Sequence, residues 1–458
     1  MKMTAPAYWN AELETQPWSE VERWQAQQIE AMLPALRQRS GLYARLHHGL
    51  PEQAALRGLA DLATLPFTLK DDLRAAQQAA SAEQPFGDNQ GVPSSDIVQA
   101  IASSGTTGDP LFYALTARDV DRLSDAIANV WFTAGIRRGD RVAHLVGLPM
   151  VAGGLPYADG FRRVGATLCW LGGFPTERIL RDMHRLRVNA LLATTSFALY
   201  LAERWDEVGR DGSEPSALCK VLGGGEPGLG QTEIRARIQR GLKLSHLRET
   251  MGLGDVLPSM WGECEQQDGM HFNAQRDVAV ELIDPDTGEQ KAWADGTSGE
   301  LVYTTFARDA TPVVRYRSRD HAQVIGLRCA CGRTSPRIRV IGRTDDMLIY
   351  KGMNVFPTAI RNFVVQRFAG QVEPLLRIVK DHKEQVRFDH PLPVEIEASA
   401  SLDAVQRAAL APAIEEAVRG QLQVRVAVSV LPHGALPRGA YKNPLVVVRD
   451  SPPKGSAA

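Results

Sequence analysis

From about residue 96 onward, short apolar runs of strand length alternate with stretches of helical period, and this alternation most constrains what the chain can fold into. Strands that alternate with helices along a sequence are typical of an α/β domain built on a mainly parallel sheet. The runs of strand length are 96–102, 141–148, 166–171, 189–194 and 219–222, and the helical patterns are 118–134, 177–186 and 231–239. We therefore expect an α/β fold class.

The pattern changes after about residue 275, where apolar runs at 277–283 and 300–305 flank a turn of sequence DPDTGE. Runs around such a turn predict an antiparallel, hairpin-rich unit. A last segment from about residue 346 mixes short strands with one helix at 403–421. Because 458 residues exceed one ordinary core, we expect a large domain over 1–344 with a β subdomain at about 275–344, a small α+β domain over 345–450, and a disordered tail at 451–458.

Charge and composition exclude several classes of function. The 52 basic and 53 acidic residues nearly cancel, so no strong field would draw the chain to nucleic acid or an anionic membrane. No run of about 18 apolar residues occurs, and residues 1–16 lack the apolar core of a signal peptide. Five cysteines, an odd number, argue against a disulfide framework. We expect a cytoplasmic protein with small-molecule partners, neither nucleic acid nor membrane.

The sharpest local feature is the run Ser103, Ser104, Gly105, Thr106, Thr107 and Gly108. Small hydroxylated residues between glycines make a loop rich in backbone N–H groups, which can wrap phosphate oxygens. No Gly-Lys-Ser/Thr follows at the right offset, so the loop is not of the Walker A type. The alternative is an ordinary Ser/Gly turn, but the strand predicted just before the run favours a phosphate-binding loop.

A second glycine cluster, at 223–228, matches the pattern G-x-G-x-x-G. It follows a predicted strand, precedes a predicted helix and has an acid, Glu249, about 20 residues further on, as dinucleotide sites do. Pro227 inside the fingerprint, and a start about 220 residues into the chain, argue against a dinucleotide. A dinucleotide-dependent oxidoreductase stays open as an alternative.

Cys264, His271, Cys329 and Cys331 lie in loop-like sequence and together make a Cys₃His set. Four ligands with no open position predict a structural Zn²⁺ site and not a catalytic one. The alternative is free cysteines on adjacent loops that share a short spacing by chance. The other two cysteines, Cys169 and Cys219, lie in predicted strands and are expected in the core.

Two further polar stretches carry little information when each is taken alone. The run 342–346 with Lys351 beyond it is typical of a turn between strands, and Lys442 on a Pro/Gly loop is typical of a solvated surface charge.

In their order along the chain, these motifs resemble the phenylacetate–CoA ligase branch of the adenylate-forming enzymes, which include acyl-CoA synthetases, nonribosomal adenylation domains and luciferases. The resemblance extends from Tyr8-Trp9-Asn10, through the run PFTLKDDL at 66–73, to Lys442. Several motifs in one order are more specific than any one alone. The resemblance implies a large N-terminal domain that binds ATP and an acid, and a small mobile C-terminal domain.

The resemblance also implies the roles of the nucleotide-binding residues. The run 103–108 matches the family's phosphate-binding loop, and Gly225, Glu226 and Pro227 match the turn that lines the adenine pocket. Met251 and Gly252 lie in the next adenine-side motif.

Asp255 closes that motif and is expected to help hold Mg²⁺. Asp320 in the run YRSRD is expected to accept hydrogen bonds from the ribose hydroxyls, and Arg343 to lie beside the nucleotide. Asp345 would be the hinge between the domains, and Lys442 the catalytic lysine that offsets negative charge when the carboxylate attacks the α-phosphorus.

In this branch the acyl pocket is built around a segment like 144–157. The resemblance places Val146, Leu148, Gly153 and Gly154 in the substrate pocket. Val146 and Leu148 stand where phenylacetate enzymes carry tyrosines, and an apolar wall suits an aryl-type or alicyclic acid.

Five positions depart from the family pattern. Asp109 stands where many relatives carry a lysine beside the phosphates, and Asp255 replaces a glutamate. Met251 replaces an aromatic residue, Gly254 a hydroxylated one, and Tyr441 a glycine. These departures indicate altered chemistry or a weakened enzyme.

The leading hypothesis is an AMP-forming acid–CoA ligase with ATP, Mg²⁺ and CoA, possible as a homodimer at the family level. One alternative keeps the adenylation but delivers the acyl group to an amine or a carrier-protein thiol. A second is a catalytically weak nucleotide- or acyl-binding relative.

Overall fold

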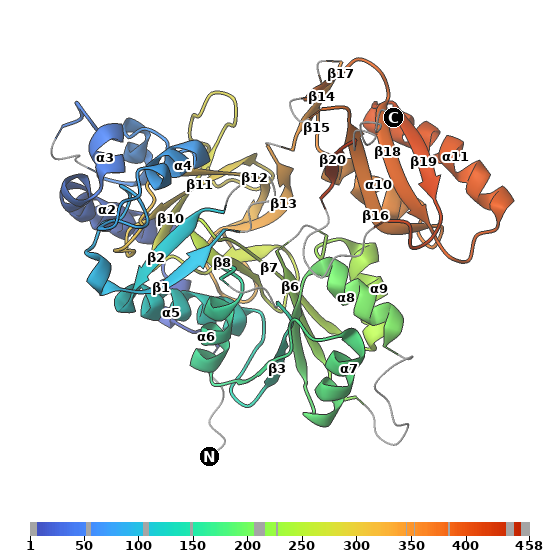
Figure 1. The fold of residues 1–458 in the computed structure, drawn as a ribbon, viewed down its shortest axis with the longest axis horizontal. Coiled ribbons are helices and arrows are strands. Elements are labelled where there is room, and N and C mark those ends of the chain that lie inside the picture. The colour runs from blue at the N-terminus through green and yellow to red at the C-terminus, as the bar shows by residue number, and fades with distance from the viewer. Residues whose placement is uncertain are drawn as a thin grey trace, which may run out of the picture.

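A computed structural model describes residues 7–51, 56–103, 110–146, 150–205, 216–225, 228–344, 346–351, 353–382, 385–436 and 444–449. The expected α/β fold class is confirmed, with one large mixed sheet, helices on both of its faces and a smaller α+β part that follows it in the chain (Figure 1).

The large sheet has eleven strands in the order β10-β11-β12-β13-β9-β8-β7-β6-β5-β3-β4. Each run predicted as a strand between 141 and 222 contains one. The parallel half consists of β3 (Arg141–His144), β4 (Thr167–Trp170), β5 (Ala190–Ala193), β6 (Lys220–Gly224) and β7 (His246–Leu253).

Alternate residues of the parallel strands belong to two different hydrophobic cores. Val142 and Leu192 pack in a core with α5 (Ala117–Thr133) and α6 (Leu155–Val164). Ala143 and Leu191 pack in a second core. Successive side chains of a strand point to opposite faces, so the two cores are the two covered faces of the sheet. The helices of the second face are α7 (Thr176–Arg185), α8 (Thr195–Arg204) and α9 (Thr232–Leu242).

The antiparallel half continues the same sheet. Its hairpin of β10 with β11, predicted around the DPDTGE turn, is confirmed, and Asp284 Oδ1 accepts hydrogen bonds from two backbone N–H groups of that turn. Antiparallel pairing begins earlier than predicted, because the chain turns back after β7 and pairs β7 with β8. The strands are β8 (Leu257–Glu263), β9 (Met270–Phe272), β10 (Val278–Ile283), β11 (Ser298–Thr305), β12 (Tyr316–Gly326) and β13 (Arg337–Arg343).

The N-terminal elements pack against the first core. The strand predicted at 96–102 is present as β1 (Ile97–Ala102), but it pairs antiparallel with β2 (Phe112–Thr116) in a separate two-stranded sheet. Among the described residues, no helix has both the length and the apolar character needed to cross a membrane. The helical elements are α1 (Ala11–Thr15), α2 (Trp18–Arg39), α3 (Gly41–Leu46), η1 (Leu59–Thr64), α4 (Lys70–Gln78) and η2 (Ser94–Asp96).

The smaller part has a third core, whose buried members all lie between Leu348 and Val426. Its helix predicted at 403–421 is confirmed as α11 (Ala404–Leu422), with the Asp403 side chain as N-cap. The domain boundary at 344/345 stays a prediction. The other elements are α10 (Pro357–Arg367), β14 (Leu348–Tyr350), β15 (Met353–Val355), β16 (Val372–Lys380), β17 (Arg387–Phe388), β18 (Leu392–Ala398), β19 (Val426–Leu431) and β20 (Val446–Val448).

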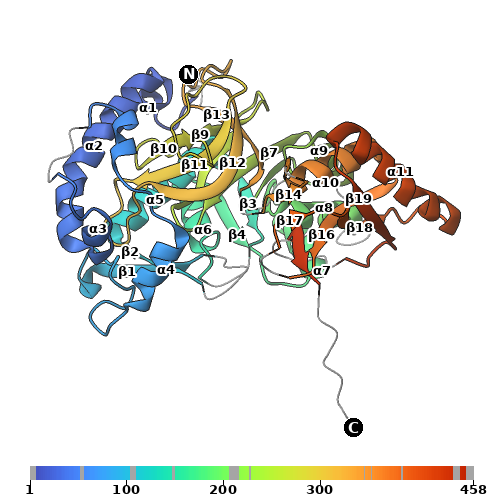
Figure 2. The same ribbon diagram turned by 90° about the horizontal axis from the view of Figure 1, so that it is seen from above.

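Helix α10 of the smaller part lies beside α9 of the larger part (Figure 2). Val365 on α10 packs into the second core, which otherwise belongs to the large sheet. Gln231, the N-cap of α9, bonds the Asn362 side chain, and Thr358 donates a hydrogen bond to the carbonyl of Ile341. Apolar and polar contacts therefore both join the two parts.

Candidate functional site

Three segments predicted to belong to one site meet at the end of β1. The N–H of Ala102 donates to the carbonyl of Met150 at 2.7 Å, and the N–H of Ala152 donates to the carbonyl of Ala102 at 3.2 Å. A Cβ added to Gly254 would lie 3.0 Å from the Cβ of Ala152 and 3.4 Å from the Cα of Ser103. This close approach gives a physical reason for glycine at 254.

Ser103, the first residue of the predicted phosphate loop, is buried and forms two hydrogen bonds with Leu111. The N–H of Ser103 donates to the carbonyl of Leu111 at 2.8 Å, and the N–H of Leu111 donates to the Ser103 hydroxyl at 3.2 Å. The two chain ends that flank residues 104–109 are therefore held together, beside Gly254.

The Asp255 side chain is buried at the centre of this site and contacts three polar side chains. The hydroxyl of Tyr113 donates to Oδ1 at 2.5 Å, and the hydroxyl of Tyr316 donates to Oδ2 at 2.9 Å. The ammonium of Lys70 lies 3.5 Å from Oδ2. Burial and the Asp255 carboxylate raise the pKa of Tyr113 and of Tyr316 well above the ordinary value, so both hydroxyls stay protonated and act as donors.

A buried arginine lies behind the carboxylate. Arg308 donates to the carbonyls of Asp255 and Val256 at 3.4 and 3.1 Å, and its guanidinium carbon lies 5.1 Å from the centre of the Tyr113 ring. Burial lowers the pKa of Arg308 although nearby carboxylates oppose the shift. Arg308 and Lys70 thus place two basic groups around one carboxylate.

Glycines on the predicted adenine side allow β6 to approach β7, and β7 to approach β8. A Cβ added to Gly224 would lie 2.3 Å from the carbonyl oxygen of Thr250, and one on Gly252 would lie 2.1 Å from that of Pro258. Gly225 follows β6 with φ at +82°, a conformation that favours glycine. Met251 pairs with Trp261 across the β7–β8 hairpin. Of the glycines in the dinucleotide-like pattern, Gly225 has the positive φ given above, and a Cβ added to Gly223 would lie 2.5 Å from the Leu229 side chain.

The predicted ribose-binding acid and the predicted nucleotide arginine face each other. Asp320 on β12 pairs in register with Arg343 on β13, and the Arg343 Nη1 donates to Asp320 Oδ1 at 3.2 Å. The charge of Arg343 lowers the pKa of Tyr316, the residue that bonds Asp255, and the charge of Asp320 raises it. Strand β12 therefore carries both Asp320 and Tyr316, the residue whose hydroxyl bonds Asp255.

An aromatic cluster surrounds His144 at the end of β3. The His144 ring stacks on Trp170 with ring centres 5.0 Å apart, and lies 6.2 Å from the ring of Tyr157 and 6.3 Å from that of Phe161. Its Nε2 lies 3.0 Å from the carbonyl oxygen of Gly154. Burial lowers the pKa of His144 to about 4, so the ring is neutral at pH 7 and can donate to that carbonyl.

Two other residues predicted for the substrate pocket lie at this cluster. The carbonyl of Val146 accepts a hydrogen bond from Trp170 Nε1 at 3.0 Å. A Cβ added to Gly153 would lie 3.2 Å from the Tyr157 ring, so glycine leaves room for the aromatic side chain.

Cys264, His271, Cys329 and Cys331 come together as predicted, with one potential ligand atom from each within 4.8 Å of all the others. Cys264 and Cys329 have their sulfurs 3.8 Å apart, and Cys331 Sγ lies 3.4 Å from His271 Nε2. Cys264 directly follows β8, His271 lies on β9, and the other two cysteines lie between β12 and β13. A hydrogen bond from Cys264 and the nearby His271 lower the pKa of Cys331, which favours a thiolate.

The cysteine cluster lies against the N-terminal segment. Tyr8 donates to the carbonyl of Cys331 at 3.0 Å, and the buried pair of Arg333 with Glu14 has an N···O distance of 2.8 Å. Of the remaining cysteines, Cys169 is buried as expected, but Cys219 is exposed. The expectation for Cys219 was wrong because this residue precedes β6, where its thiol reaches the carbonyl of Asn189.

Several predicted site residues lie outside the described residues. They are Ser104, Gly105, Thr106, Thr107, Gly108, Leu148, Glu226, Pro227, Asp345 and Lys442, and the two departures Asp109 and Tyr441 also lie outside.

Sequence reasoning missed Lys70, Tyr113 and Arg308 as members of the site. Lys70 lies in the run PFTLKDDL, which carried part of the family resemblance and was the one available signal. Tyr113 alternates with apolar residues in a strand, and no local pattern marks it.

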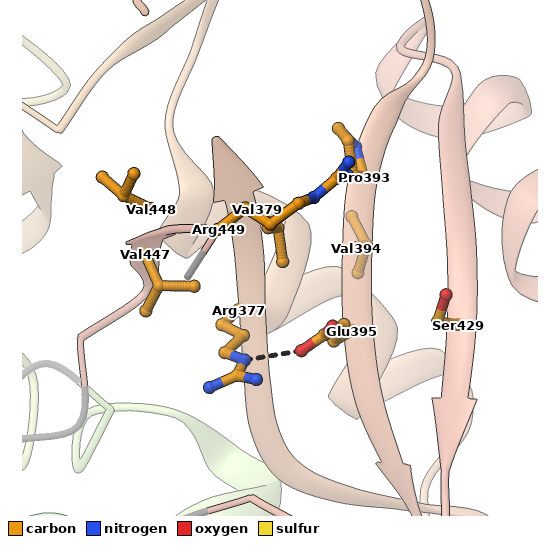
Figure 3. A pocket seen from close by; sticks show the side chains of 9 residues that line it. All are labelled: Arg377, Val379, Pro393, Val394, Glu395, Ser429, Val447, Val448 and Arg449. Atoms are coloured by element: carbon orange, nitrogen blue, oxygen red, sulfur yellow. Dashed lines mark hydrogen bonds and ion pairs between the residues drawn. The ribbon is translucent and has the colours of Figure 1, made fainter. Parts of the chain in front are cut away.

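A separate pocket lies on the sheet of the smaller part, on the face where Arg377 of β16 and Glu395 of β18 point (Figure 3). Arg377 donates to Glu395 across the two strands at 2.6 Å. Arg449 at its rim forms an ion pair with Asp381 at 3.5 Å. Both cations of this pocket therefore have acidic partners within the chain.

Comparisons with known proteins show which family the sequence resembles. Residues 23–305 match the family described as AMP-binding enzyme, and residues 352–449 match AMP-binding enzyme C-terminal domain. The chain is 32% identical to a phenylacetate–coenzyme A ligase of Thermus thermophilus, over 93% of this chain and 96% of that protein. It is 30% identical to a phenylacetate–coenzyme A ligase of Escherichia coli K12, over 84% of this chain and 85% of that protein.

Among solved structures, a 2-hydroxyisobutyryl-CoA ligase in the postadenylation state with 2-HIB-AMP matches 98% of this chain and 94% of its own. The TM-score is 0.86 and the sequence identity is 24%, so this likeness supports the fold. An open conformation of the same ligase, with 2-HIB-AMP and CoA, has a TM-score of 0.71 over 98% of this chain and 95% of its own.

The resemblance proposed from the motifs is confirmed by the family match, which spans most of the chain, and by relatives similar over nearly their whole length. The chain belongs to the AMP-binding enzyme family, as a ligase in the branch of the phenylacetate–coenzyme A ligases.

Proposed function

We propose that this protein is an AMP-forming acid–CoA ligase that activates a small aryl-type carboxylic acid as an acyl-adenylate and then transfers the acyl group to coenzyme A. One observation carries the proposal: Ser103, the Gly254–Asp255 turn and the pocket segment at 151–154 meet in one place. The names of the relatives, all phenylacetate–coenzyme A ligases, support the same activity.

The nucleotide half of the reaction depends on placing ATP between these elements. Backbone N–H groups of the phosphate loop would bind the triphosphate, and Asp320 would accept hydrogen bonds from the ribose hydroxyls. A buried carboxylate such as Asp255 is the hard oxygen ligand that Mg²⁺ prefers. When bound, Mg²⁺ would neutralise charge on the departing pyrophosphate.

The proposed acid site is the aromatic cluster around His144. A flat aryl group would stack between side chains such as Trp170 and Tyr157, which bury apolar area and favour ring-on-ring geometry. The neutral His144 adds no charge that would hold the carboxylate away from the nucleotide. An apolar, aromatic wall therefore supports an aryl-type acid over a short polar one.

Lys442 would supply the cation that bridges the attacking carboxylate and the α-phosphate. Asp345 would be the hinge at which the small domain turns away, which opens a path for the CoA thiol. Both roles rest on the position of these residues in the family motifs.

The test is AMP release from ATP across a panel of aryl, arylacetic and alicyclic acids, with and without CoA, with Lys442→Ala as the control. Acid-dependent AMP release that rises with CoA and collapses in the variant is the expected result. Release that is indifferent to CoA would redirect the assignment to an amine or carrier-protein acceptor. No AMP with any acid would contradict the ligase and favour a nucleotide-binding relative.

We also propose that Cys264, His271, Cys329 and Cys331 hold one structural Zn²⁺. Sulfurs on a tetrahedral zinc with Zn–S bonds of about 2.3 Å lie about 3.8 Å apart, and the sulfurs of Cys264 and Cys329 are 3.8 Å apart. The set has four ligands, as structural sites do, and the thiolate favoured at Cys331 is the form that binds metal.

A cytoplasmic location and a homodimer belong to the same proposal. A reducing compartment suits the five free cysteines, and light scattering on purified protein measures the oligomeric state.

A further inference from the structure

The Asp255 carboxylate is held by groups from three distant parts of the chain. Tyr113 comes from β2, Tyr316 from the start of β12, and Lys70 from the first turn of α4. Their bonds to Asp255 span 142, 61 and 185 residues of sequence respectively. Such long-range contacts to one side chain fix it relative to the whole site.

The pattern of donors limits what else this carboxylate can do. An ionised carboxylate offers about four lone-pair positions. The Tyr113 hydroxyl takes one at 2.5 Å and the Tyr316 hydroxyl one at 2.9 Å, while the longer Lys70 contact of 3.5 Å takes a third. With the donors that the described part of the chain supplies, one lone-pair position of Asp255 stays open to a metal ion.

We propose that Tyr113 and Tyr316 are positioning residues: their hydroxyls fix the Asp255 carboxylate in one orientation and present its remaining lone pair to the Mg²⁺ that accompanies ATP. This inference rests on the proposed function. The side chain of Asp255 has a single methylene group and little reach, so the surrounding structure must place the ligand oxygen. Partners that orient a metal-binding carboxylate commonly change metal affinity by about tenfold or more when they are removed.

Within the described residues, the hydroxyls of Tyr113 and Tyr316 form no hydrogen bond to a group other than Asp255, so both can orient its carboxylate. Tyr113 and Tyr316 are almost fully buried, at 2% exposure each, and their hydroxyls bond Asp255. Arg308, behind the carboxylate, bonds only backbone carbonyls there, so it adds positive charge without taking a lone pair of Asp255.

The experiment measures ATP binding by calorimetry across a series of Mg²⁺ concentrations, with neither acid nor CoA present. In Tyr113→Phe and Tyr316→Phe, the Mg²⁺ concentration that gives half-maximal ATP binding should rise by about tenfold. Tyr303→Phe is the matched control, because Tyr303 is equally buried and its hydroxyl accepts from Trp261 at 2.9 Å. Its midpoint should stay at the wild-type value.

A second arm separates positioning from general loss of structure. In an Asp255→Asn background, neither tyrosine substitution should shift the Mg²⁺ midpoint further, because the group they position no longer carries the ligand charge. Wild-type midpoints in both tyrosine variants, or equal shifts with and without Asp255, would overturn the proposal. ATP binding by the wild type that ignores Mg²⁺ would overturn it too. Absence of turnover with every acid would contradict the proposed function alone, since this assay requires no turnover.

Discussion

Arg237 on α9 forms an ion pair with Glu373 on β16, so a charged contact joins the larger and smaller parts of the chain. Glu373 is buried, with its side chain 4% exposed, and His433 of the smaller part lies 3.5 Å from its other oxygen. Arg237 also bonds Glu203 on α8 at 3.1 Å. The pair therefore ties β16 to two helices that cover the large sheet.

Arg237→Ala should loosen this contact, because it leaves a buried carboxylate short of its main cationic partner, a loss of about 1–3 kcal/mol. We expect amide hydrogen exchange in α10 to become about tenfold faster. Arg204→Ala is the control, since Arg204 pairs with Glu177 and, among the described residues, has no ion pair with the smaller part. Unchanged exchange in α10 would show that the Val365 packing and the Gln231–Asn362 and Thr358–Ile341 contacts hold the two parts together without this ion pair.

The proposed zinc at the cysteine cluster should make the thermal stability of the protein depend on bound metal. Purified protein should contain about one zinc per chain, and a Cys329→Ser/Cys331→Ser variant should lose it. Loss of a structural ion should lower the melting temperature by about 5–10 °C. Cys219→Ser, which changes an exposed cysteine away from the cluster, should keep both zinc and melting temperature. Metal-free protein as purified, by elemental analysis, would contradict the site.

The cysteine set and the Asp255 environment show what could and could not be predicted from sequence. Cysteine and histidine at metal-ligand spacing carry their chemistry in their identity, so the cluster was predictable although its members lie up to 67 residues apart along the chain. Tyr113 is an ordinary strand residue, and Lys70 carries a signal only as part of the run PFTLKDDL, so the contacts of both depend on where the fold brings them. Their contacts with Asp255 span 142 and 185 residues, which no local pattern encodes.

The same contrast appears in the fold. Apolar runs predicted β3, β4, β5 and β6 because helices cover both faces of that sheet half, whereas β7 was not predicted. The run at 96–102 looked alike, yet it forms a separate antiparallel pair with β2, because strand pairing depends on the partner and not on composition. Similarly, apolar surroundings alone predicted Cys219 to be in the core, and its place just before β6 leaves it exposed.

Replacing Lys70 should weaken the binding of ATP and not that of the acid. Lys70→Met would remove the cation that lies 3.5 Å from Asp255 Oδ2. Since the Lys70 side chain is 36% exposed, water screens its charge, and we expect a loss of about 1 kcal/mol, or about a fivefold rise in the KM for ATP. Lys70→Arg should restore most of it. A change in the KM for the acid with none for ATP would contradict this role.

Two buried histidines should make the free energy of unfolding depend on pH. Burial lowers the pKa of His144 and of His47 to about 4, below the unfolded value of about 6.5. The unfolded chain therefore binds more protons between these values, so each histidine stabilises the fold fully above about pH 6.5 and this contribution is lost as pH falls toward 4.

Acids with raised pKa values act in the opposite direction, because they stabilise the fold more as pH falls. Burial and the nearby Glu263, for example, raise the pKa of Glu249 to about 7. The clean measurement is therefore a difference between variants. The free energy of unfolding, followed by urea denaturation from pH 7 to pH 4, should fall less steeply in His144→Gln than in the wild type, by on the order of 3 kcal/mol over this range. His48→Gln, at an exposed position, should follow the wild-type curve. Parallel curves for His144→Gln and the wild type would mean that His144 takes up its proton without unfolding the cluster around Trp170.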